Sequence, residues 1–198
     1  EISVLACRGI NGEIEVYPVA ENIHHDNILF ETRVPANISE DTSKKAMALA
    51  KSVMEIFEGV GMFCVEMFVD REGNVEVNEV APRPHNSGHY TIEACMTSQF
   101  EQHIRAVSGL PLGSSELLKP VVMRNILGSM GYMGDAKVIG ADEALKIKGA
   151  YLHIYGKEKS VPKRKMGHLT VIANTLKEAE EKAEEAFNAV KIIGKERL

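Results

Sequence analysis

Two glutamates occupy positions that would face each other across a predicted β-hairpin. Residues 62–69 form an almost wholly apolar run interrupted by Glu66, and residues 75–80, which include Glu79, form a second β-rich run. The residues Arg71-Glu72-Gly73-Asn74 between the two runs are typical of a turn. Facing residues of an antiparallel pair have Cβ atoms about 4.5–5.5 Å apart, and like charges there repel. The sequence therefore predicts two carboxylates held face to face.

A divalent cation would relieve this repulsion. Burying two carboxylates beside an apolar strand is costly unless a positive charge lies between them. Mg²⁺ suits the pair because it binds a few carboxylates and keeps its other positions for water and phosphate oxygens. Asn78 would help to orient the set. The prediction assumes that Asp70 faces Val75, since a shift of one residue removes the pairing. The alternative is that both glutamates lie at a solvated sheet edge.

A loop rich in hydrogen-bond donors follows the second strand. Its sequence, Arg83-Pro84-His85-Asn86-Ser87-Gly88-His89, contains a guanidinium, two imidazoles, an amide and a hydroxyl. Pro82 and Pro84 stiffen the backbone, and Gly88 permits close approach. Arg83 is suited to bidentate recognition of a small planar oxyanion. We expect an anion site here, the alternative being a proline-braced turn.

A third candidate is the basic segment 157–165, which could hold a phosphate group within an acidic chain. A run of charges is also typical of a solvated loop, and that alternative stays open. His24 and His25 have no metal-ligand spacing, so their own pattern indicates surface histidines.

The elements that must position these residues fall into two parts. The N-terminal part has β-rich runs at 2–8 and 13–20, joined by the hairpin signal Asn11-Gly12, and a third run at 28–34. Helical spacing follows from an N-cap at Ser39 to a stop at Gly59. A further helix begins with a capping box, and its apolar stripe comprises Phe100, Ile104 and Val107.

From Gly113 the pattern changes to short strands with two helices. Strands are predicted at 121–127, 151–156 and 168–174, a short helix near 142–147, and a final helix after the Thr175 capping box. We place a boundary near 113–120, which gives domains 1–113 and 114–198.

Composition bounds the class of protein. The 198 residues carry a formal net charge of −5, which argues against a nucleic-acid-binding surface. The three cysteines, Cys7, Cys64 and Cys95, show neither a disulfide framework nor metal-type spacing, and a reducing cytoplasmic setting is the simplest interpretation. Nothing approaches the roughly 18 apolar residues of a membrane span.

Together these motifs resemble a known family. The segments 65–68, 77–89, 97–103 and 163–168 are similar to the signatures of 5-(carboxyamino)imidazole ribonucleotide synthase, an ATP-grasp enzyme of purine biosynthesis, and the similarity spans essentially the whole chain. Sister ATP-grasp enzymes, including formate-dependent glycinamide ribonucleotide transformylase, share the stretch 78–85. The continuation Asn86-Ser87-Gly88-His89 is the more specific part.

The resemblance implies a role for each candidate residue. ATP and its magnesium ions would be held by Glu1 at the ribose, His24, Glu66, Asn78 and Glu79, with the two facing glutamates as the metal ligands. Bicarbonate, and the carboxyphosphate made from it, would be bound by Arg83, His85, Asn86 and Ser87. The phosphate of aminoimidazole ribonucleotide would be bound by Lys157 and Arg164.

The resemblance also implies a fold and a reaction. The fold is α/β in the broad sense (α+β), with a mixed, mainly antiparallel sheet backed by helices, followed by a small α+β domain. Bicarbonate would attack the γ-phosphate of ATP, and the resulting carboxyphosphate would carboxylate the ribotide amine. Family members commonly form homodimers.

Two departures from the family limit what we expect of this chain. Val161 stands where family members usually have an arginine. The N-terminal subdomain and the glycine-rich lid of the family precede Glu1, so we expect the isolated chain to have little ligase activity. The alternatives are another purine-pathway ATP-grasp ligase, such as the transformylase, and a non-catalytic fragment that binds nucleotide or metal.

Overall fold

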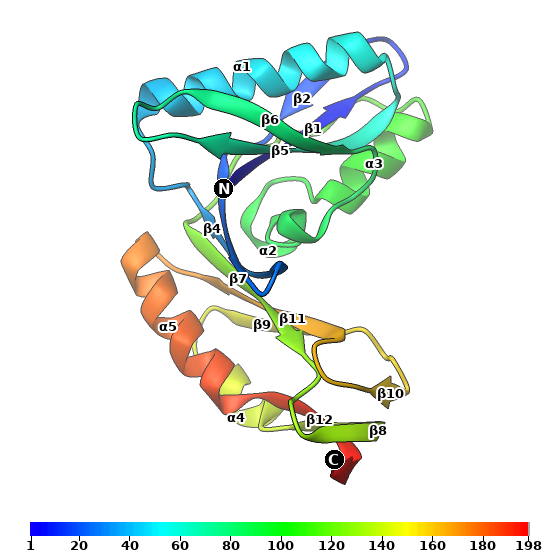
Figure 1. Ribbon diagram of the computed structural model, residues 1–198. Helices are drawn as coiled ribbons and strands as arrows, with labels where there is room; N and C mark the ends of the chain where they lie inside the picture. The colour runs from blue at the N-terminus through cyan, green and yellow to red at the C-terminus, as the bar shows by residue number, and fades with distance from the viewer. Residues whose placement is uncertain (198) are drawn as a thin grey trace. The chain divides into compact units, whose positions relative to one another are not determined.

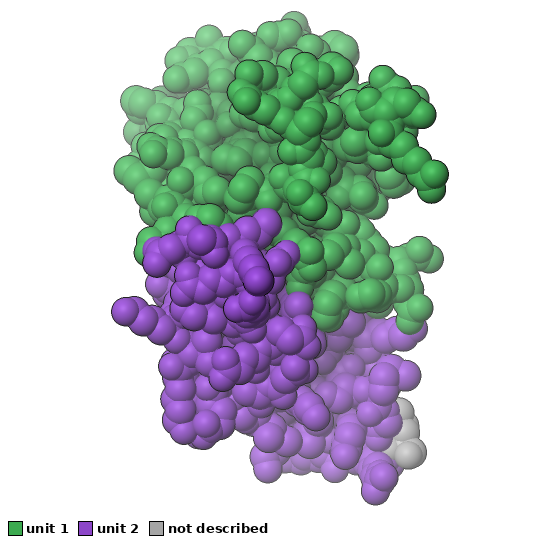
Figure 2. Space-filling model, turned by 90° about the vertical axis from the view of Figure 1, so that its left-hand side faces the viewer, with its two compact units in different colours: residues 1–120 green, residues 121–198 purple. Residues whose placement is uncertain are grey.

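The computed structural model describes residues 1–197 and divides into two compact units, Glu1–Pro120 and Val121–Leu198 (Figures 1 and 2). The division after Pro120 lies at the end of the boundary region expected near 113–120, because the segment after residue 113 packs onto the first unit. The Ser115 hydroxyl donates to Glu15 Oε1 at 2.8 Å, and Leu117 forms a β-bridge with Cys95. The chain therefore changes units at Pro120.

The first unit is an antiparallel sheet with helices on both faces (Figure 1). Its strands lie in the order β6-β5-β1-β3-β4, and β2 pairs with β1. The elements are β1 (Ile2–Arg8), β2 (Ile14–Val16), β3 (Ala20–His25), β4 (Ile28–Val34), α1 (Glu40–Phe57), β5 (Gly61–Val69), β6 (Val75–Ala81), the 3₁₀ turn η1 (Asn86–Gly88), α2 (Thr91–Ala94) and α3 (Gln99–Val107). The predicted mainly antiparallel sheet backed by helices is confirmed.

Helix α1 covers one face of this sheet. Ser39 caps its N-terminus, accepting a hydrogen bond from the Thr42 backbone N–H at 3.1 Å, as the sequence predicts. The buried residues Ala46 and Ala50 pack against a core that includes Val4 and Val65. Side chains alternate along a strand, so the neighbouring positions of β1 and β5 point to the opposite face. That face carries the candidate site.

The strand predicted at 13–20 is divided in the structure. The hairpin at residues 9–12 is confirmed, with Arg8 paired to Ile14, but β2 ends at Val16 and a new strand, β3, begins at Ala20. Pro18 lies between them and has no backbone N–H to donate to a ladder. The sequence did not predict β3, which carries His24.

The β5–β6 hairpin reaches the predicted pairing by a different route. Val69, not Asp70, faces Val75, so the turn is one residue longer than expected. A bulge then shifts the register, because Met67 faces Val77 whereas Glu66 faces Glu79. Asn78 is the extra residue. The longer turn shifts the register by one residue and the bulge shifts it back, so Glu66 and Glu79 face each other as predicted.

Asp70 closes this turn with its carboxylate. Oδ1 accepts from the backbone N–H groups of Asn74 at 2.8 Å and Glu72 at 2.9 Å, and Oδ2 accepts from Asn74 Nδ2 at 2.7 Å. These hydrogen bonds, those from Asn74 foremost, lower the pKa of Asp70 below its usual value of 3.8. The ionised side chain is thus part of the turn.

Acidification should therefore weaken the hairpin through Asp70. A carboxyl with a lowered folded-state pKa stabilises the fold above its unfolded-state pKa, and this contribution is lost as the pH falls through the folded-state value. We expect Asp70→Asn to lose less stability than the parent chain between pH 6 and pH 3 in thermal unfolding. Asp142→Asn, an exposed change in the second unit, is the control. Equal acid dependence of Asp70→Asn and the parent chain would contradict this account.

Helix α3 exposes its apolar stripe to solvent and buries the other side. Phe100, Ile104 and Val107 are 42%, 59% and 46% exposed, whereas Gln99 and Gln102 are fully buried. The Ser98 hydroxyl accepts from the Glu101 backbone N–H, so the predicted cap is present. The helix thus turns two amide side chains toward the sheet and the loops beside it.

The described part of the second unit combines strands with two helices. Three of its strands lie in the order β7-β11-β9, and three others form a sheet in the order β10-β8-β12. The elements are β7 (Val121–Leu127), β8 (Tyr132–Ile139), α4 (Ala141–Leu145), β9 (Ala150–Ile154), β10 (Lys159–Ser160), β11 (Lys165–Ile172), α5 (Leu176–Ala189) and β12 (Lys191–Arg197). Thr175 caps α5, whose Ala179, Ala183 and Ala186 lie in the core. This is the expected α+β unit, although β8, β10 and β12 were not predicted.

Across residues 1–197, no helix is both long and apolar enough to cross a membrane.

Candidate nucleotide and metal site

A row of polar side chains crosses the first unit on the face opposite α1. Glu66 on β5 lies directly between Ser3 on β1 and Glu79 on β6. Directly paired residues share one face of a sheet, so the two carboxylates point to the same side. Glu66 is half-buried and Glu79 is exposed. This arrangement leaves the Glu66 carboxylate partly covered and the Glu79 carboxylate in contact with solvent.

Glu1, directly before β1, and His24, on the neighbouring strand β3, join this row. One ligand atom from each of Glu1, His24 and Glu66 lies within 4.8 Å of the others, and Glu1 Oε2 is 3.6 Å from His24 Nδ1. His24 reaches this position at a register shift between β3 and β4. His24 has no metal-ligand spacing along the chain because the three residues are brought together across strands. Carboxylate oxygens and an imidazole nitrogen are suitable ligands for a divalent cation.

The loop 83–89 leaves the end of β6 beside this row. Arg83 is exposed, and its Nη1 donates to the carbonyl of Pro84 at 3.1 Å. His85 and Asn86 are half-buried. Ser87 is 1% exposed, and its Oγ lies 3.1 Å from Ser3 Oγ and 2.9 Å from His85 Nδ1. The hydroxyl of Ser87 is thus directed toward the sheet.

Cys64 lies beneath the same loop, with Sγ 3.5 Å from Ser87 Oγ. Burial raises the pKa of the Cys64 thiol to about 12. A thiol rather than a thiolate is therefore present at neutral pH, and this cysteine is not an activated nucleophile.

Lys157 and Arg164 lie on one basic segment of the second unit. Lys157 Nζ donates to the carbonyl of Lys165 at 2.6 Å, and Arg164 Nη1 donates to the carbonyl of Lys159 at 2.8 Å. Each cation thus also holds the backbone of the segment that presents it. Val161 is 38% exposed on the same segment.

A buried histidine lies beside this basic segment and was assigned no role from the sequence. His168 is 2% exposed, stacks on His153 with ring centroids 4.4 Å apart, and has Nδ1 3.0 Å from the Tyr155 hydroxyl. Burial raises the pKa of Tyr155 to about 12, so its hydroxyl stays protonated. Only the pairing of β11 with β9 brings these rings together.

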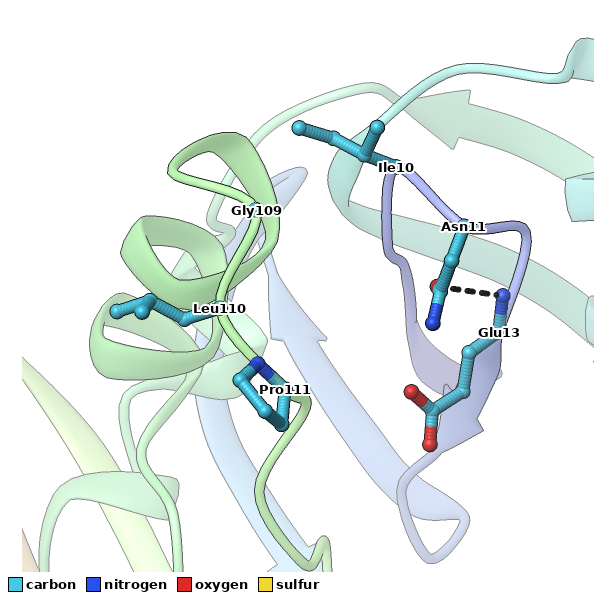
Figure 3. Close-up of a pocket in the computed structure, with 6 residues that line it drawn as sticks. All are labelled: Ile10, Asn11, Glu13, Gly109, Leu110 and Pro111. Atoms are coloured by element: carbon cyan, nitrogen blue, oxygen red, sulfur yellow. Dashed lines mark hydrogen bonds between the residues drawn. The ribbon is translucent and has the colours of Figure 1, made fainter.

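A separate hollow in the first unit lies between the β1–β2 loop and the end of α3 (Figure 3). It is lined by Ile10, Asn11, Glu13, Gly109, Leu110 and Pro111. Asn11 Oδ1 accepts from the Glu13 backbone N–H at 3.1 Å, as Figure 3 shows. None of these six residues is basic, so the hollow has no side-chain cation to hold a phosphate.

Comparison with known proteins assigns this arrangement to a class. The ATP-grasp domain matches residues 1–100, and the phosphoribosylaminoimidazole carboxylase C-terminal domain matches residues 121–182. The first match covers the carboxylate row and the donor-rich loop. The chain belongs to the ATP-grasp family.

Two relatives with established names illustrate the similarity. N5-carboxyaminoimidazole ribonucleotide synthase of Bacillus subtilis is 52% identical over 170 residues, which cover 86% of this chain and 43% of the relative. Phosphoribosylaminoimidazole carboxylase of Saccharomyces cerevisiae is 41% identical over 187 residues, which cover 92% and 32%. The chain thus spans less than half the length of these relatives. It is similar to the C-terminal portion of such synthases, which confirms the resemblance seen in the sequence.

Solved structures show the same likeness. The N5-carboxyaminoimidazole ribonucleotide synthetase of Thermotoga maritima superposes with a TM-score of 0.92 at 52% identity, covering 98% of this chain and 52% of that one. An Aspergillus clavatus N5-carboxyaminoimidazole synthase, in complex with ADP and 5-aminoimidazole ribonucleotide, gives 0.85 at 36% identity, covering 94% and 50%.

Proposed function

We propose that this chain is the metal-, nucleotide- and ribotide-phosphate-binding part of an enzyme that carboxylates aminoimidazole ribonucleotide, using ATP and bicarbonate. The observation that carries the proposal is the row in which Glu66 faces Glu79, with Glu1 and His24 beside it. The donor-rich loop 83–89 follows the same strand, and its Ser87 contacts Ser3 of this row, so the proposed metal ligands and anion-binding groups would lie on one face.

The residues of this row fit Mg²⁺. Glu66 and Glu79 would be its protein ligands, because hard carboxylate oxygens on facing strands suit a cation that retains water and phosphate oxygens. Asn78, which is exposed at the bulge, would lie beside them, while Glu1 and His24 would contact the nucleotide. When bound, Mg²⁺ would neutralise the charge that develops on the ATP phosphates.

The reaction would proceed in two steps. A bicarbonate oxygen would form a bond to the γ-phosphorus as the bond to ADP breaks, giving carboxyphosphate. The exocyclic amine of the ribotide would then form a bond to the carboxyl carbon, losing a proton as phosphate leaves. Arg83, His85 and Asn86 would hold the oxyanions in place, and Lys157 and Arg164 would hold the ribotide phosphate. Catalysis would rest on positioning and charge neutralisation.

Ser87 would have a supporting role in this scheme. The sequence resemblance includes it among the bicarbonate ligands, but its buried hydroxyl contacts Ser3 and His85. We therefore propose that Ser87 acts by orienting His85.

The setting of this activity follows the family. We propose a homodimer in a cytoplasmic, reducing environment, in which the three buried cysteines stay as thiols. The remaining part of the relatives' length would supply the rest of the nucleotide site.

Calorimetric titration of ADP into the chain tests the metal and nucleotide part of the proposal. We expect ADP binding in the presence of Mg²⁺ and its loss on adding a chelator, with little bicarbonate-dependent ADP release from ATP. ADP binding that is unchanged by the chelator would contradict the proposed metal site. A titration with aminoimidazole ribonucleotide should perturb the NMR signals of residues 83–89, and a response to glycinamide ribonucleotide instead would favour the transformylase.

A further inference from the structure

Gln99, at the start of α3, clamps the backbone of the donor-rich loop. The His85 backbone N–H donates to Gln99 Oε1 at 2.9 Å, and Gln99 Nε2 donates to the His85 carbonyl at 2.8 Å. A backbone N–H can only donate and a carbonyl can only accept, so this pair fixes which end of the amide is which. The loop is pressed against the clamp, because a Cβ at Gly88 would lie 2.5 Å from Gln99 Oε1.

The fixed amide determines the protonation of His89. Gln99 Nε2 also lies 3.1 Å from His89 Nδ1. Since Nε2 is a donor, Nδ1 must accept, and a proton on Nδ1 would face the amide protons of Gln99. His89 is thereby held neutral with its ring proton on Nε2. Its ring also stacks on Phe100 at 5.6 Å between centroids, which fixes the ring plane.

A chain of hydrogen bonds from the sheet ends at the ring of His85. Asn22 Nδ2 donates to Ser3 Oγ at 2.8 Å, Ser3 Oγ donates to Ser87 Oγ at 3.1 Å, and Ser87 Oγ lies 2.9 Å from His85 Nδ1. Asn22 Oδ1 accepts from the Thr32 hydroxyl at 3.1 Å. The chain of donors thus runs from the sheet toward the ring. The Ser87 hydroxyl proton has a second possible acceptor in Cys64 Sγ, at 3.5 Å, but the Ser87 backbone N–H can only donate, and it points at Nδ1 at 3.4 Å. His85 therefore accepts at Nδ1 as well.

We propose that Gln99 and the buried Asn22–Ser3–Ser87 chain are positioning groups that hold both His85 and His89 as neutral imidazoles protonated on Nε2. Each ring then offers an N–H donor without net charge, and Arg83 is the cation of the loop. The inference rests on the proposed function only for what these rings would do, which is to present N–H donors to bicarbonate and carboxyphosphate. The tautomers themselves can be measured without any ligand.

Gln102 provides a matched control on the same helix. It is also fully buried, its Oε1 accepts from the Gly113 backbone N–H at 2.7 Å, and its Nε2 donates to the Gly113 carbonyl at 2.6 Å. Gln99→Glu and Gln102→Glu thus make the same isosteric change in the same kind of backbone clamp. Only the change at Gln99 places a carboxylate oxygen against a histidine nitrogen.

The test is ¹⁵N NMR of the ligand-free 198-residue chain at pH 7.5, with histidine labelled and signals assigned by His85→Gln and His89→Gln. We expect unprotonated Nδ1 and protonated Nε2 in both rings. In Gln99→Glu, His89 should shift to the imidazolium pattern, while Gln102→Glu should leave both rings as in the parent chain. A proton on Nδ1 of either ring in the parent chain would overturn the proposal, as would a Gln99→Glu spectrum identical to that of Gln102→Glu.

If the variants do not fold, the parent spectrum alone decides the question. Failure of the chain to bind Mg²⁺ and ADP would contradict the proposed function but leave these tautomers unaffected. The two ideas therefore fail separately.

Discussion

Replacing Glu79 by glutamine should weaken Mg²⁺-dependent ADP binding by at least about 10- to 100-fold, the usual cost of losing even an outer-shell partner of a metal ligand, while making the metal-free chain slightly more stable. Glu79 faces Glu66 across the β5–β6 pair, and like charges placed directly opposite destabilise a sheet, typically by a few tenths of a kcal/mol. Removing one charge removes the repulsion in the metal-free protein, but it also removes a ligand of the cation. Calorimetric titration with Mg²⁺ and ADP, and chemical unfolding in EDTA, measure the two effects.

Weaker Mg²⁺ and ADP binding together with higher stability of the metal-free chain would distinguish a metal site from a general loss of charge. Glu76→Gln removes the same charge from an exposed position of the same strand, opposite Phe68, where no carboxylate faces it. We expect the control to bind Mg²⁺ and ADP like the parent chain. If Glu79→Gln and Glu76→Gln behave alike in both measurements, the facing pair is not a metal site.

Replacing Lys157 by methionine should weaken binding of the ribotide phosphate by about 10- to 150-fold, since a hydrogen bond to a charged group contributes about 1.5–3 kcal/mol. Methionine retains much of the side chain's apolar length over the Tyr155 ring, which Lys157 Nζ approaches at 5.7 Å from the centroid. Calorimetric titration of the chain with aminoimidazole ribonucleotide, at low and high salt, measures the loss and its ionic part.

Lys159 and Val161 supply the controls for this experiment. Lys159→Met removes a cation that is paired with Asp135 on β8, so it should have a small effect. Val161→Arg introduces, at an exposed position of the segment, the arginine that the family resemblance leads us to expect there, and we expect it to tighten phosphate binding. Equal losses in Lys157→Met and Lys159→Met would show that the segment acts only through its net charge.

Local sequence signals predicted much of the fold because they report local physics. The N-caps at Ser39, Ser98 and Thr175 each accept the expected hydrogen bond from a backbone N–H three residues on. The hairpin at Asn11-Gly12 also formed where its turn chemistry indicated. These features depend on neighbours in the chain, so a single sequence contains the information.

The carboxylate pair shows how a correct prediction can rest on a wrong detail. The expected four-residue turn placed Asp70 opposite Val75, whereas the carboxylate of Asp70 instead closes a longer turn. The bulge at Asn78 shifts the pairing of β6 with β5 by one residue, so that Glu66 still faces Glu79. Neither periodicity nor composition indicates a bulge, because it depends on how β6 twists against β5.

The positioning groups of the loop were missed for a different reason. Ser3 and Ser87 are 84 residues apart in the chain, and only the folded sheet joins them. The apolar stripe on α3 was visible, but the buried side of that helix is defined by Gln99 and Gln102, which sequence reasoning normally places in solvent. Two glutamines three residues apart, on the side of the helix away from its stripe, are the signal that could have indicated buried amides.

Replacing Mg²⁺ by paramagnetic Mn²⁺, which prefers similar oxygen ligands, gives the most direct test of the metal site. In NMR spectra of the chain with ADP, we predict that Mn²⁺ broadens the signals of Glu66, Glu79 and their strand neighbours first, and that Glu79→Gln largely abolishes this. Broadening centred instead on exposed carboxylates of α5 such as Glu181 and Glu185, with the β5–β6 hairpin unaffected, would contradict the account.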